Sequence, residues 1–295
     1  MNHTNALPRL RPDPIPAIHP EPEYRASGKR AEWYTQMKSA LQVPWMGVVT
    51  MAYAHYPTFF AELWRGLQPL AASLPFVQAS RALRDETEAR AKALGPSSIV
   101  RRLQALGYAP RELDQMRDTV EVFSHGNFPY LLIATLTRLL LEGGEPRGSA
   151  EARRFSGRHA PDVDVPLILM EAHHADATTR AVYDDIKATL GLPFVNTDYR
   201  AFARWPSWFA FAWSEIKPLV ADAAYEPACL AVHERALNMA ANELPNPGSL
   251  NSQALCAAAE ADAPLQEVIS VARLFQWLLP GLVLNVALLR AQLGD

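Results

Sequence analysis

The sequence predicts an all-α protein made of two related helical bundles that pack as a pseudo-dimer within one chain. Three observations predict this fold class. Apolar residues recur at spacings of three and four, no segment alternates convincingly with a period of two, and one stretch of sequence occurs twice. The first spacing is typical of amphipathic helices, whereas half-buried strands alternate. With 295 residues, 49% of them hydrophobic, the chain is long enough to bury a sizeable core.

The bulk composition argues against several classes of partner. The net charge is -3 and no block of like charges occurs, so we expect no nucleic-acid partner. Cys229 and Cys256 provide neither a disulfide framework nor the spacing of a metal site. The first residues lack the features of a signal peptide, and the longest apolar stretch, 275–289, is too short and too interrupted to span a bilayer securely. We expect a cytoplasmic protein without a membrane partner.

The elements follow in chain order. Residues 1–30 carry six prolines, which fix φ and remove backbone donors, so we expect an extended N-terminal arm; a disordered tail is the alternative. Residues 143–166 are rich in Gly, Pro and charge, and we interpret them as a linker. Helical patterns occupy the remainder, and the expected helices are 31–42, 76–94, 111–125, 128–142, 180–190, 228–243, 264–278 and 281–293.

The repeated stretch defines the predicted domains. Tyr34–Leu70 and Tyr183–Leu219 align without a gap at an offset of 149 residues, and 12 of the 37 pairs are identical. We therefore divide the chain into helical repeat 1 (31–142) and helical repeat 2 (167–295). Two related bundles can bury their apolar faces against each other about a pseudo-twofold axis, which predicts an active site between the repeats. The alternative is a helical scaffold without chemistry, although solenoids usually repeat every 20–50 residues.

The first candidate for chemistry is a position where the two copies differ. Asp198 of the second copy corresponds to Val49 of the first, which suggests that the position is buried. A buried carboxylate is costly unless it is paired, and its pKa tends to rise, which suits a general base. Helix capping is the alternative, because Asn196, Thr197 and Asp198 are all good N-cap residues before the helical run 199–204.

A second polar residue replaces an apolar one in the other half. Asn127 lies in the stretch FSHGNFPYLL, and its approximate counterpart is Leu279. A turn between two helices is the alternative, because Gly-Asn closely precedes Pro129. An amide beside a carboxylate can fix a water molecule for attack: the carboxylate accepts a proton while the amide holds the oxygen. Asn127 and Asp198 would form such a pair if both faced one cleft.

Other kinds of site are not supported by the sequence. His125, His173 and His174 lack the spacing of zinc ligands. The chain contains neither a G-x-S-x-G motif nor a Gly-rich phosphate loop. We therefore expect no metal and no cofactor.

Three motifs together resemble the group I 2-haloacid dehalogenases. They are L-x-V-P-W at Leu41–Trp45, G-N-x-x-Y-L-L at Gly126–Leu132, and D-Y-x-A-F-A-x-W-P at Asp198–Pro206. Their order and spacing carry the resemblance, which extends from about residue 30 to the end. It implies an all-helical, cofactor-free hydrolase of two related halves, with a 2-haloacid as its small-molecule substrate and a homodimeric assembly.

The resemblance also implies roles for individual residues. The general-base aspartate falls on Asp198, and the asparagine that helps to hold the water falls on Asn127. In this family water attacks Cα directly, without an ester intermediate, and displaces halide with inversion to give a 2-hydroxy acid. The predicted substrate-binding residues are Trp45, Val48, Asn196, Thr197, Phe275 and Tyr130.

Enantiomer selection and departures from the family pattern concern a few positions. Non-selective members have alanine two residues before the aspartate; here Asn196 stands there, as in D-selective relatives, so the D enantiomer is expected.

The lysine of the family's G-N-P-K is missing, and a tyrosine is replaced by Phe275. Two alternatives stay open: an ester intermediate on Asp198, and a non-catalytic pseudo-dimer that binds a small carboxylic acid or a protein partner.

Overall fold

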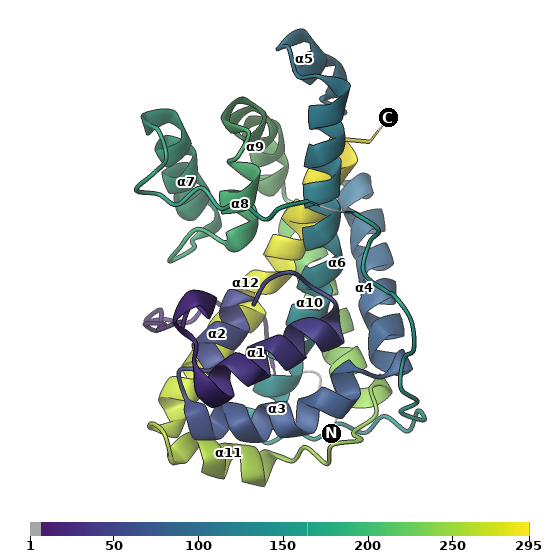
Figure 1. The fold of residues 1–295 in the computed structure, drawn as a ribbon, viewed down its shortest axis with the longest axis vertical. Helices are drawn as coiled ribbons and strands as arrows, with labels where there is room; N and C mark the ends of the chain where they lie inside the picture. Colours follow the sequence, from purple (N-terminus) through teal and green to yellow (C-terminus); the bar gives the residue numbers. More distant parts are fainter. Residues whose placement is uncertain (1–6, 164, 295) are drawn as a thin grey trace. The chain divides into compact units, whose positions relative to one another are not determined.

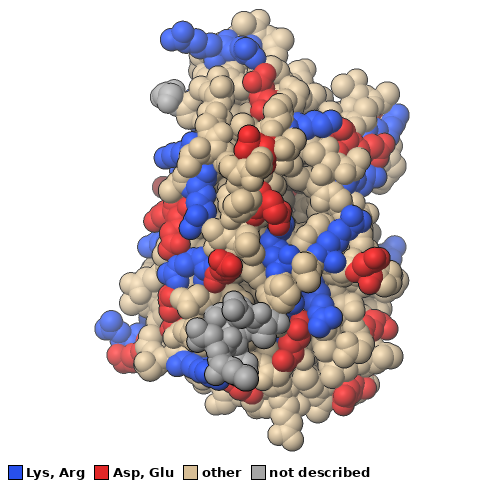
Figure 2. Space-filling model, turned by 180° about the vertical axis from the view of Figure 1, so that it is seen from behind, with Lys and Arg blue, Asp and Glu red and all other residues tan. Residues whose placement is uncertain are grey.

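The computed structural model describes residues 7–163 and 165–294, and its regular structure there is helical (Figure 1). Within these ranges no strand forms, and the single ladder contact is an isolated bridge between Ser73 and Arg154. The predicted all-α class is confirmed for these residues. Lys and Arg are interspersed with Asp and Glu on the face drawn in Figure 2, so neither sign of charge dominates that face.

The helices vary in length from one and a half turns to almost nine. A 3-10 turn, η2 (Glu23–Arg25), precedes the first helix, and a π-helix, η3 (Met239–Glu243), follows the tenth. The α-helices are α1 (Gly28–Leu41), α2 (Val48–Tyr53), α3 (Pro57–Ala71), α4 (Leu74–Ala93), α5 (Val100–Ala105), α6 (Pro110–Leu141), α7 (Ala177–Leu190), α8 (Thr197–Phe202), α9 (Pro206–Val220), α10 (Tyr225–Asn238), α11 (Ser252–Glu260) and α12 (Leu265–Gln292).

The chain forms two compact units, each assembled from three separate stretches. Unit 1 combines the described residues up to Arg84 with Gly126–Ala160 and Leu230–Pro280, and unit 2 combines Asp85–His125, Pro161–Cys229 and the described residues from Gly281 onward. Contacts therefore group the chain differently from the sequence repeats. The division into 31–142, 143–166 and 167–295 describes sequence similarity and stays a prediction.

Two pairs of expected helices are single helices in the structure. The pair 111–125 and 128–142 is α6, which contains Pro129, and the pair 264–278 and 281–293 is α12, which contains Pro280. A proline removes one backbone hydrogen bond and bends a helix, but it does not always end it. Both prolines lie in runs of buried apolar residues. Burial of these runs outweighs the local break, and this is why the predicted turns were wrong.

Helix α12 is the most apolar long helix of the chain. By length and composition it is able to cross a membrane, but 83% of its most apolar 18-residue window is buried inside the protein. Such burial is typical of a helix that forms part of a core. Leu274, Leu284 and Leu288 are among its fully buried residues.

The described part of the N-terminal arm contains no helix before residue 23. Three successive residues of the arm form hydrogen bonds with helices of unit 1: two through their carbonyls and the third through its own side chain. His233 Nε2 lies 2.8 Å from the Leu7 carbonyl, Arg138 donates to the Pro8 carbonyl at 3.0 Å, and Arg9 donates to the Trp277 carbonyl at 3.1 Å. These hydrogen bonds hold the arm in extended form against the helices of unit 1.

Helices α1–α3 of unit 1 and α7–α9 of unit 2 have matching bounds. Each helix of the second set begins and ends 149 residues after its counterpart. Helices α3 and α9 both start with a proline, whose fixed φ suits the first turn of a helix. Helices α1 and α7 both end at a left-handed residue, Gln42 (φ 50°) in one and Gly191 (φ 67°) in the other. The two sets are therefore alike in length, spacing and termination.

Side-chain hydrogen bonds also recur at the 149-residue offset. In each set, an indole of the third helix donates to a side chain of the first helix, and a tyrosine of the first helix donates to a carbonyl of the preceding segment. The pairs are Trp64 with Gln36 (2.9 Å), Trp213 with Asp185 (2.7 Å), Tyr34 with the Glu21 carbonyl (2.9 Å) and Tyr183 with the Met170 carbonyl (2.7 Å).

Candidate active site

The candidate base lies at the start of the short helix α8 in unit 2. Asn196 occupies the N-cap position, and Thr197 and Asp198 are the first two helical residues. All three side chains are buried, and Asp198 is only 3% exposed. The Asn196 side chain makes no capping hydrogen bond. The capping interpretation is therefore wrong for Asn196, and Asp198 lies inside the helix instead of capping it.

The surroundings of Asp198 combine the start of a helix with a buried phenol. Its carboxylate lies in the first turn of α8, where the helix dipole favours negative charge. The next residue, Tyr199, is 1% exposed. Burial, together with the nearby Asp198 charge, raises the pKa of the Tyr199 phenol above its ordinary value. The interior around α8 thus contains an acidic group and a hydroxyl that stays protonated.

Arg200 is the basic residue of α8 itself. Its Nη1 binds both carboxylate oxygens of Glu171, at 2.7 and 2.9 Å, and its Nη2 donates to the Thr197 hydroxyl at 3.2 Å. The guanidinium is therefore neutralised by Glu171, and it orients the hydroxyl of Thr197. This arrangement favours a supporting role for Arg200.

Two buried polar atoms at α8 lack a hydrogen-bond partner among the described residues. They are the Oδ1 atom of Asn196 and the Nε atom of Arg200. An unsatisfied buried polar group costs roughly 1–3 kcal/mol. Native proteins usually satisfy such groups with water or a ligand. The start of α8 is therefore a place where a polar ligand is expected.

The second group of predicted residues lies in unit 1, on α6 and the loop before α2. The Tyr130 hydroxyl donates to the Trp45 carbonyl at 2.7 Å, and the two rings lie 6.0 Å apart. Close approach of the loop to the helix requires two glycines. A Cβ on Gly126 would lie 2.4 Å from the Trp45 ring, and one on Gly47 would lie 2.9 Å from the Tyr130 ring. The loop is thereby held closely against α6.

Asn127 follows Gly126 within α6 and is 4% exposed. The interpretation of this residue as part of a turn is therefore wrong, because the helix continues through it. Val48 is the first residue of α2 and is half-buried. The hydroxyl of Tyr130 is committed to a backbone carbonyl, so any contact with a substrate would come from its ring.

Phe275 lies on the part of α12 that belongs to unit 1, and it is 1% exposed. Its ring packs edge-on against Tyr53, with centroids 6.1 Å apart. The Tyr53 hydroxyl and both amide atoms of Gln276 are buried without a hydrogen-bond partner among the described residues. Sequence reasoning missed Tyr53. Gln276 interrupts an apolar stretch, which was a usable signal for a buried polar group.

The structure thus brings most of the predicted residues into two groups. Asn196, Thr197 and Asp198 lie together in unit 2. Trp45, Val48, Asn127 and Tyr130 lie on adjoining segments of unit 1, where Phe275 contacts Tyr53. The first group contains a buried carboxylate, and the second contains a buried amide and several aromatic rings.

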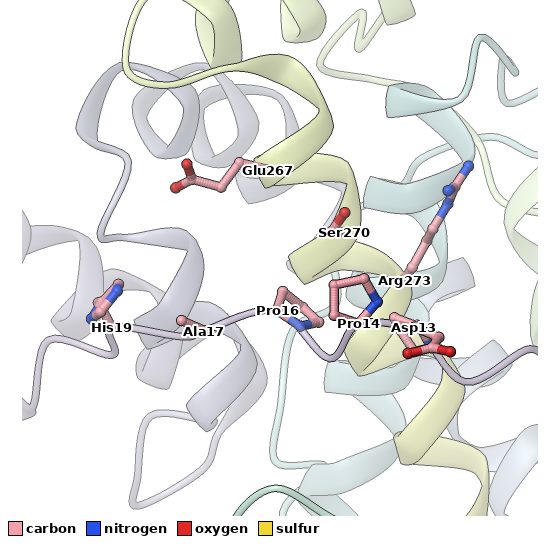
Figure 3. Close-up of a pocket in the computed structure, with 9 residues that line it drawn as sticks. Asp13, Pro14, Pro16, Ala17, His19, Glu267, Ser270 and Arg273 are labelled. Carbon is pink, nitrogen blue, oxygen red and sulfur yellow. The ribbon is translucent and has the colours of Figure 1, made fainter.

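Over residues 7–163 and 165–294, no group of three or more His, Cys, Asp or Glu residues is arranged to hold a metal. The exposed rings of His173 and His174 lie 4.0 Å apart. A pocket of about 450 Å³ in unit 1 lies between the arm and the start of α12 (Figure 3). Glu267, Ser270 and Arg273 line it, and none of the predicted site residues does.

Comparison with known proteins finds relatives that share most of this chain. A family model described as "Halocarboxylic acid dehydrogenase DehI" matches residues 44–196. An (R)-2-haloacid dehalogenase of Rhizobium sp. (strain NHG3) is 47% identical over 83% of this chain and 95% of the relative. A second (R)-2-haloacid dehalogenase, from Pseudomonas putida, is 38% identical over 93% of this chain and 92% of the relative.

Solved structures agree with the sequence relatives. A structure described as a D-2-haloacid dehalogenase in complex with L-LA is similar to this chain with a TM-score of 0.88. It is 37% identical in sequence, and the match covers 97% of this chain and 99% of that chain.

Proposed function

The chain belongs to the DehI family of 2-haloacid dehalogenases, and from that premise we propose that it hydrolyses short 2-haloalkanoic acids to 2-hydroxy acids, favouring the D enantiomer. The observation that carries the proposal is the identity of 47% and 38% to two enzymes named (R)-2-haloacid dehalogenase, over more than four-fifths of the chain. The family resemblance seen in the sequence motifs is confirmed by these matches.

The proposed chemistry assigns the base to Asp198. One proton of a water molecule passes to the Asp198 carboxylate, and the water oxygen forms a bond to Cα. The carbon–halogen bond breaks, and halide leaves with the bonding electron pair from the opposite side, so configuration inverts. Burial of Asp198 to 3% exposure supports this role, because exclusion of bulk water strengthens the electrostatic effect of a base.

Asn127 is proposed to hold the same water molecule. A side-chain amide offers a donor and an acceptor, which fix the orientation of a water oxygen. Its place in the middle of α6 supports this role, because a buried helical residue is more rigid than a residue in a turn. Trp45, Val48 and Phe275 are proposed as apolar walls that exclude bulk solvent.

Asn196 is proposed to select the enantiomer. The residue is 4% exposed, and its Oδ1 atom has no hydrogen-bond partner among the described residues. A buried side chain of this size reduces the space for one arrangement of substituents at Cα. The name (R)-2-haloacid dehalogenase of the two relatives supports the D enantiomer as the accepted one.

We further propose that helices α1–α3 and α7–α9 are copies of one ancestral unit within a pseudo-dimeric chain. The 149-residue offset of all six helix bounds supports this proposal, as do the recurrent indole and tyrosine hydrogen bonds. Only the second copy carries the carboxylate.

The proposed function is tested by halide release. Purified protein is offered D- and L-2-chloropropionate separately, and chloride is measured over time. The proposal expects release from the D enantiomer and an L-2-hydroxy acid as product. Release from the L enantiomer at an equal rate would contradict the selectivity, and no release from either by folded protein would overturn the activity.

A further inference from the structure

A buried hydrogen-bonded chain of three side chains lies next to the candidate base. The Tyr225 hydroxyl donates to Asn285 Oδ1 at 2.9 Å, and Asn285 Nδ2 donates to the Tyr199 hydroxyl oxygen at 3.0 Å. The three residues come from α10, α12 and α8, and all belong to unit 2. Their exposures are 6%, 0% and 1% respectively. We refer to them as the Tyr-Asn-Tyr network.

The geometry of the network fixes the orientation of each group. Asn285 uses its oxygen as an acceptor and its nitrogen as a donor, so its amide plane is held from both sides. The Tyr199 hydroxyl remains protonated, because burial raises its pKa above the ordinary value, and a neutral phenol avoids a second buried charge near Asp198. A fully satisfied buried network rigidifies the elements that it joins.

The network occurs only in the half of the chain that carries the carboxylate. At the 149-residue offset, Tyr225 corresponds to Phe76 and Tyr199 to Thr50. The later part of the repeat aligns at an offset of 152 residues, at which Asn285 corresponds to Ile133. Phe76 and Ile133 are unable to form hydrogen bonds through their side chains. The Thr50 hydroxyl instead donates to the Gly47 carbonyl within its own segment. The three polar side chains therefore occur in the copy that contains Asp198. The first copy forms the same helices without them.

Helix α8 needs external support to hold Asp198 in place. It has six residues, and so short a helix is not stable by itself. Tyr199 directly follows Asp198 in this helix, so a hydrogen bond to its hydroxyl restrains the same turn. The ring of Tyr199 also lies 6.4 Å from the ring of Phe209 on α9. The hydrogen bond from Asn285 thus ties the turn that carries the base to α12.

We infer that Tyr199, Asn285 and Tyr225 are positioning residues that fix the turn of α8 carrying Asp198, so that its carboxylate is oriented to take a proton from water. The inference rests on the proposed function of Asp198. The three side chains act through the base and have no assigned contact with the substrate. A displacement of about 1 Å in a reacting group can lower turnover by about 100-fold, so a positioning defect is measurable.

The first test variant is Asn285→Leu, which removes both hydrogen bonds of the Asn285 amide; the Tyr225 hydroxyl keeps its longer hydrogen bond to the Gly281 carbonyl, at 3.4 Å. We expect kcat for D-2-chloropropionate to fall by about 10- to 100-fold, while KM changes by less than about threefold. The melting temperature also falls, because unsatisfied buried groups destabilise the fold. A fall in stability alone is therefore not diagnostic.

The second variant separates positioning from stability. The triple change Tyr199→Phe, Asn285→Leu and Tyr225→Phe replaces the whole network by apolar groups of similar shape. Such replacements are often nearly neutral in stability, so we expect the melting temperature to recover while kcat stays low. Recovery of kcat together with the melting temperature would overturn the inference. Tyr34→Phe removes a comparable hydroxyl in unit 1 and is the matched control; its kcat should stay within about twofold of the wild type.

A readout without substrate distinguishes this inference from the proposed function. Amide hydrogen exchange over residues 197–202 should be faster in the triple variant than in the wild type, at equal melting temperature. If the wild type releases no halide, the proposed function fails, and unchanged exchange would in addition overturn the restraint of α8. If the wild type is active and exchange is unchanged, only the positioning inference fails.

Discussion

At the scale of single residues, the molecule combines a buried acid with a buried amide. Asp198 and Asn127 are 3% and 4% exposed, although Asp and Asn are mostly exposed in proteins. Sequence comparison of the two copies located both, because each replaces an apolar counterpart, Val49 or Leu279. The capping and turn alternatives were reasonable for local sequence. The Asn196 side chain makes no capping hydrogen bond, and the observed helix bounds place Asp198 within α8 and Asn127 within α6.

Asp198→Asn preserves the shape of the side chain but removes the base. We expect kcat to fall by about 10²- to 10⁴-fold with an unchanged circular dichroism spectrum. Asn127→Ala should also lower kcat, but adding it to Asp198→Asn should cost little more, because the two residues are proposed to serve one water molecule. Single-turnover halide assays on the four proteins measure this coupling. Additive losses would show that the two residues act independently.

An ester intermediate on Asp198 is excluded or established by one labelling experiment. In a single turnover in ¹⁸O-water with enzyme in excess, direct attack places the label in the 2-hydroxy acid at once. The ester route instead places the label in the enzyme carboxylate, and the first product carries unlabelled oxygen. Mass spectrometry of the product and of the peptide containing Asp198 reads both outcomes.

Asn196→Ala should relax the choice of enantiomer. Removal of the amide frees space next to Asp198, and we expect kcat/KM for L-2-chloropropionate to rise by about 10-fold or more. The value for the D enantiomer should change by less than about threefold. Asn196→Gln keeps the amide and is the control that should retain selectivity. An unchanged ratio of the two enantiomers in the alanine variant would remove Asn196 from the selectivity argument.

His233 predicts a dependence of stability on pH. Burial, together with the nearby Arg138 and Arg9 charges, lowers its pKa to about 4, below the value of about 6.5 in an unfolded chain. Between pH 6.5 and 4 the unfolded chain therefore binds a proton that the folded chain does not. Stability contributed by neutral His233 is present above pH 6.5 and is lost as pH falls, by about 1.4 kcal/mol per pH unit.

Chemical denaturation between pH 4.5 and 7.5 measures this slope. His233→Gln retains a donor for the Leu7 carbonyl but does not titrate, so its stability should vary less over this range. His173→Gln, at an exposed position, is the control that should keep the wild-type slope. Equal slopes for wild type and His233→Gln would contradict the buried neutral state of His233.

At the scale of elements, the short helices and the loops between them place the candidate residues. The sequence predicted α1, α4, α7 and α10 near their observed positions, because each shows a helical pattern of apolar residues. Helices α2, α3 and α9 were not predicted, and α8 was expected only as a helical run at 199–204, although all four lie within the repeated motif. Helices α2 and α8 have only six residues each, and a periodic pattern needs a longer window.

Gly126 shows how closely the loop before α2 approaches α6. Gly126→Ala would place a Cβ 2.4 Å from the Trp45 ring, so the loop or the helix must shift. We expect a loss of about 1–3 kcal/mol in the free energy of unfolding and a lower kcat. The double variant Gly126→Ala with Trp45→Phe makes room for the methyl group, as Phe194 occupies the matching place in the other copy.

Denaturant titration and halide release compare the wild type, Gly126→Ala and the double variant. The double variant should regain a substantial part of the lost stability. If Gly126→Ala alone is as stable as the wild type, the close packing of this loop on α6 is not as the structure describes it.

At the scale of the whole molecule, the two halves share a helical framework but differ in their buried polar side chains. The all-α class and the family were predictable from the repeat and from three motifs, because both depend on patterns spread along the chain. The grouping of residues into two units was not predictable, since each unit combines three separate stretches. The Tyr-Asn-Tyr network was also missed, although Asn285 interrupts an apolar run and corresponds to the apolar Ile133 in the other copy.

This difference between the two copies predicts that introduction of a carboxylate alone does not make the first copy catalytic. Val49 is 2% exposed, and Val49→Asp in an Asp198→Asn background places an acid at the equivalent position. The counterparts of the network there are Thr50, Phe76 and Ile133, so no hydrogen-bonded chain supports the turn. We expect no regain of halide release. We also expect a loss of several kcal/mol in stability, because the new carboxylate is buried without a designed partner.

The pH dependence of that loss identifies its cause. Burial disfavours the charged form and raises the pKa of the new carboxyl, so the acid binds a proton more readily in the folded chain than in the unfolded chain. The destabilisation by Val49→Asp is therefore largest at neutral pH and shrinks as pH falls toward 4. Val49→Asn, which cannot ionise, should show a loss that is independent of pH. Halide release by the Val49→Asp, Asp198→Asn protein would instead mean that the framework shared by the two copies is sufficient to activate water.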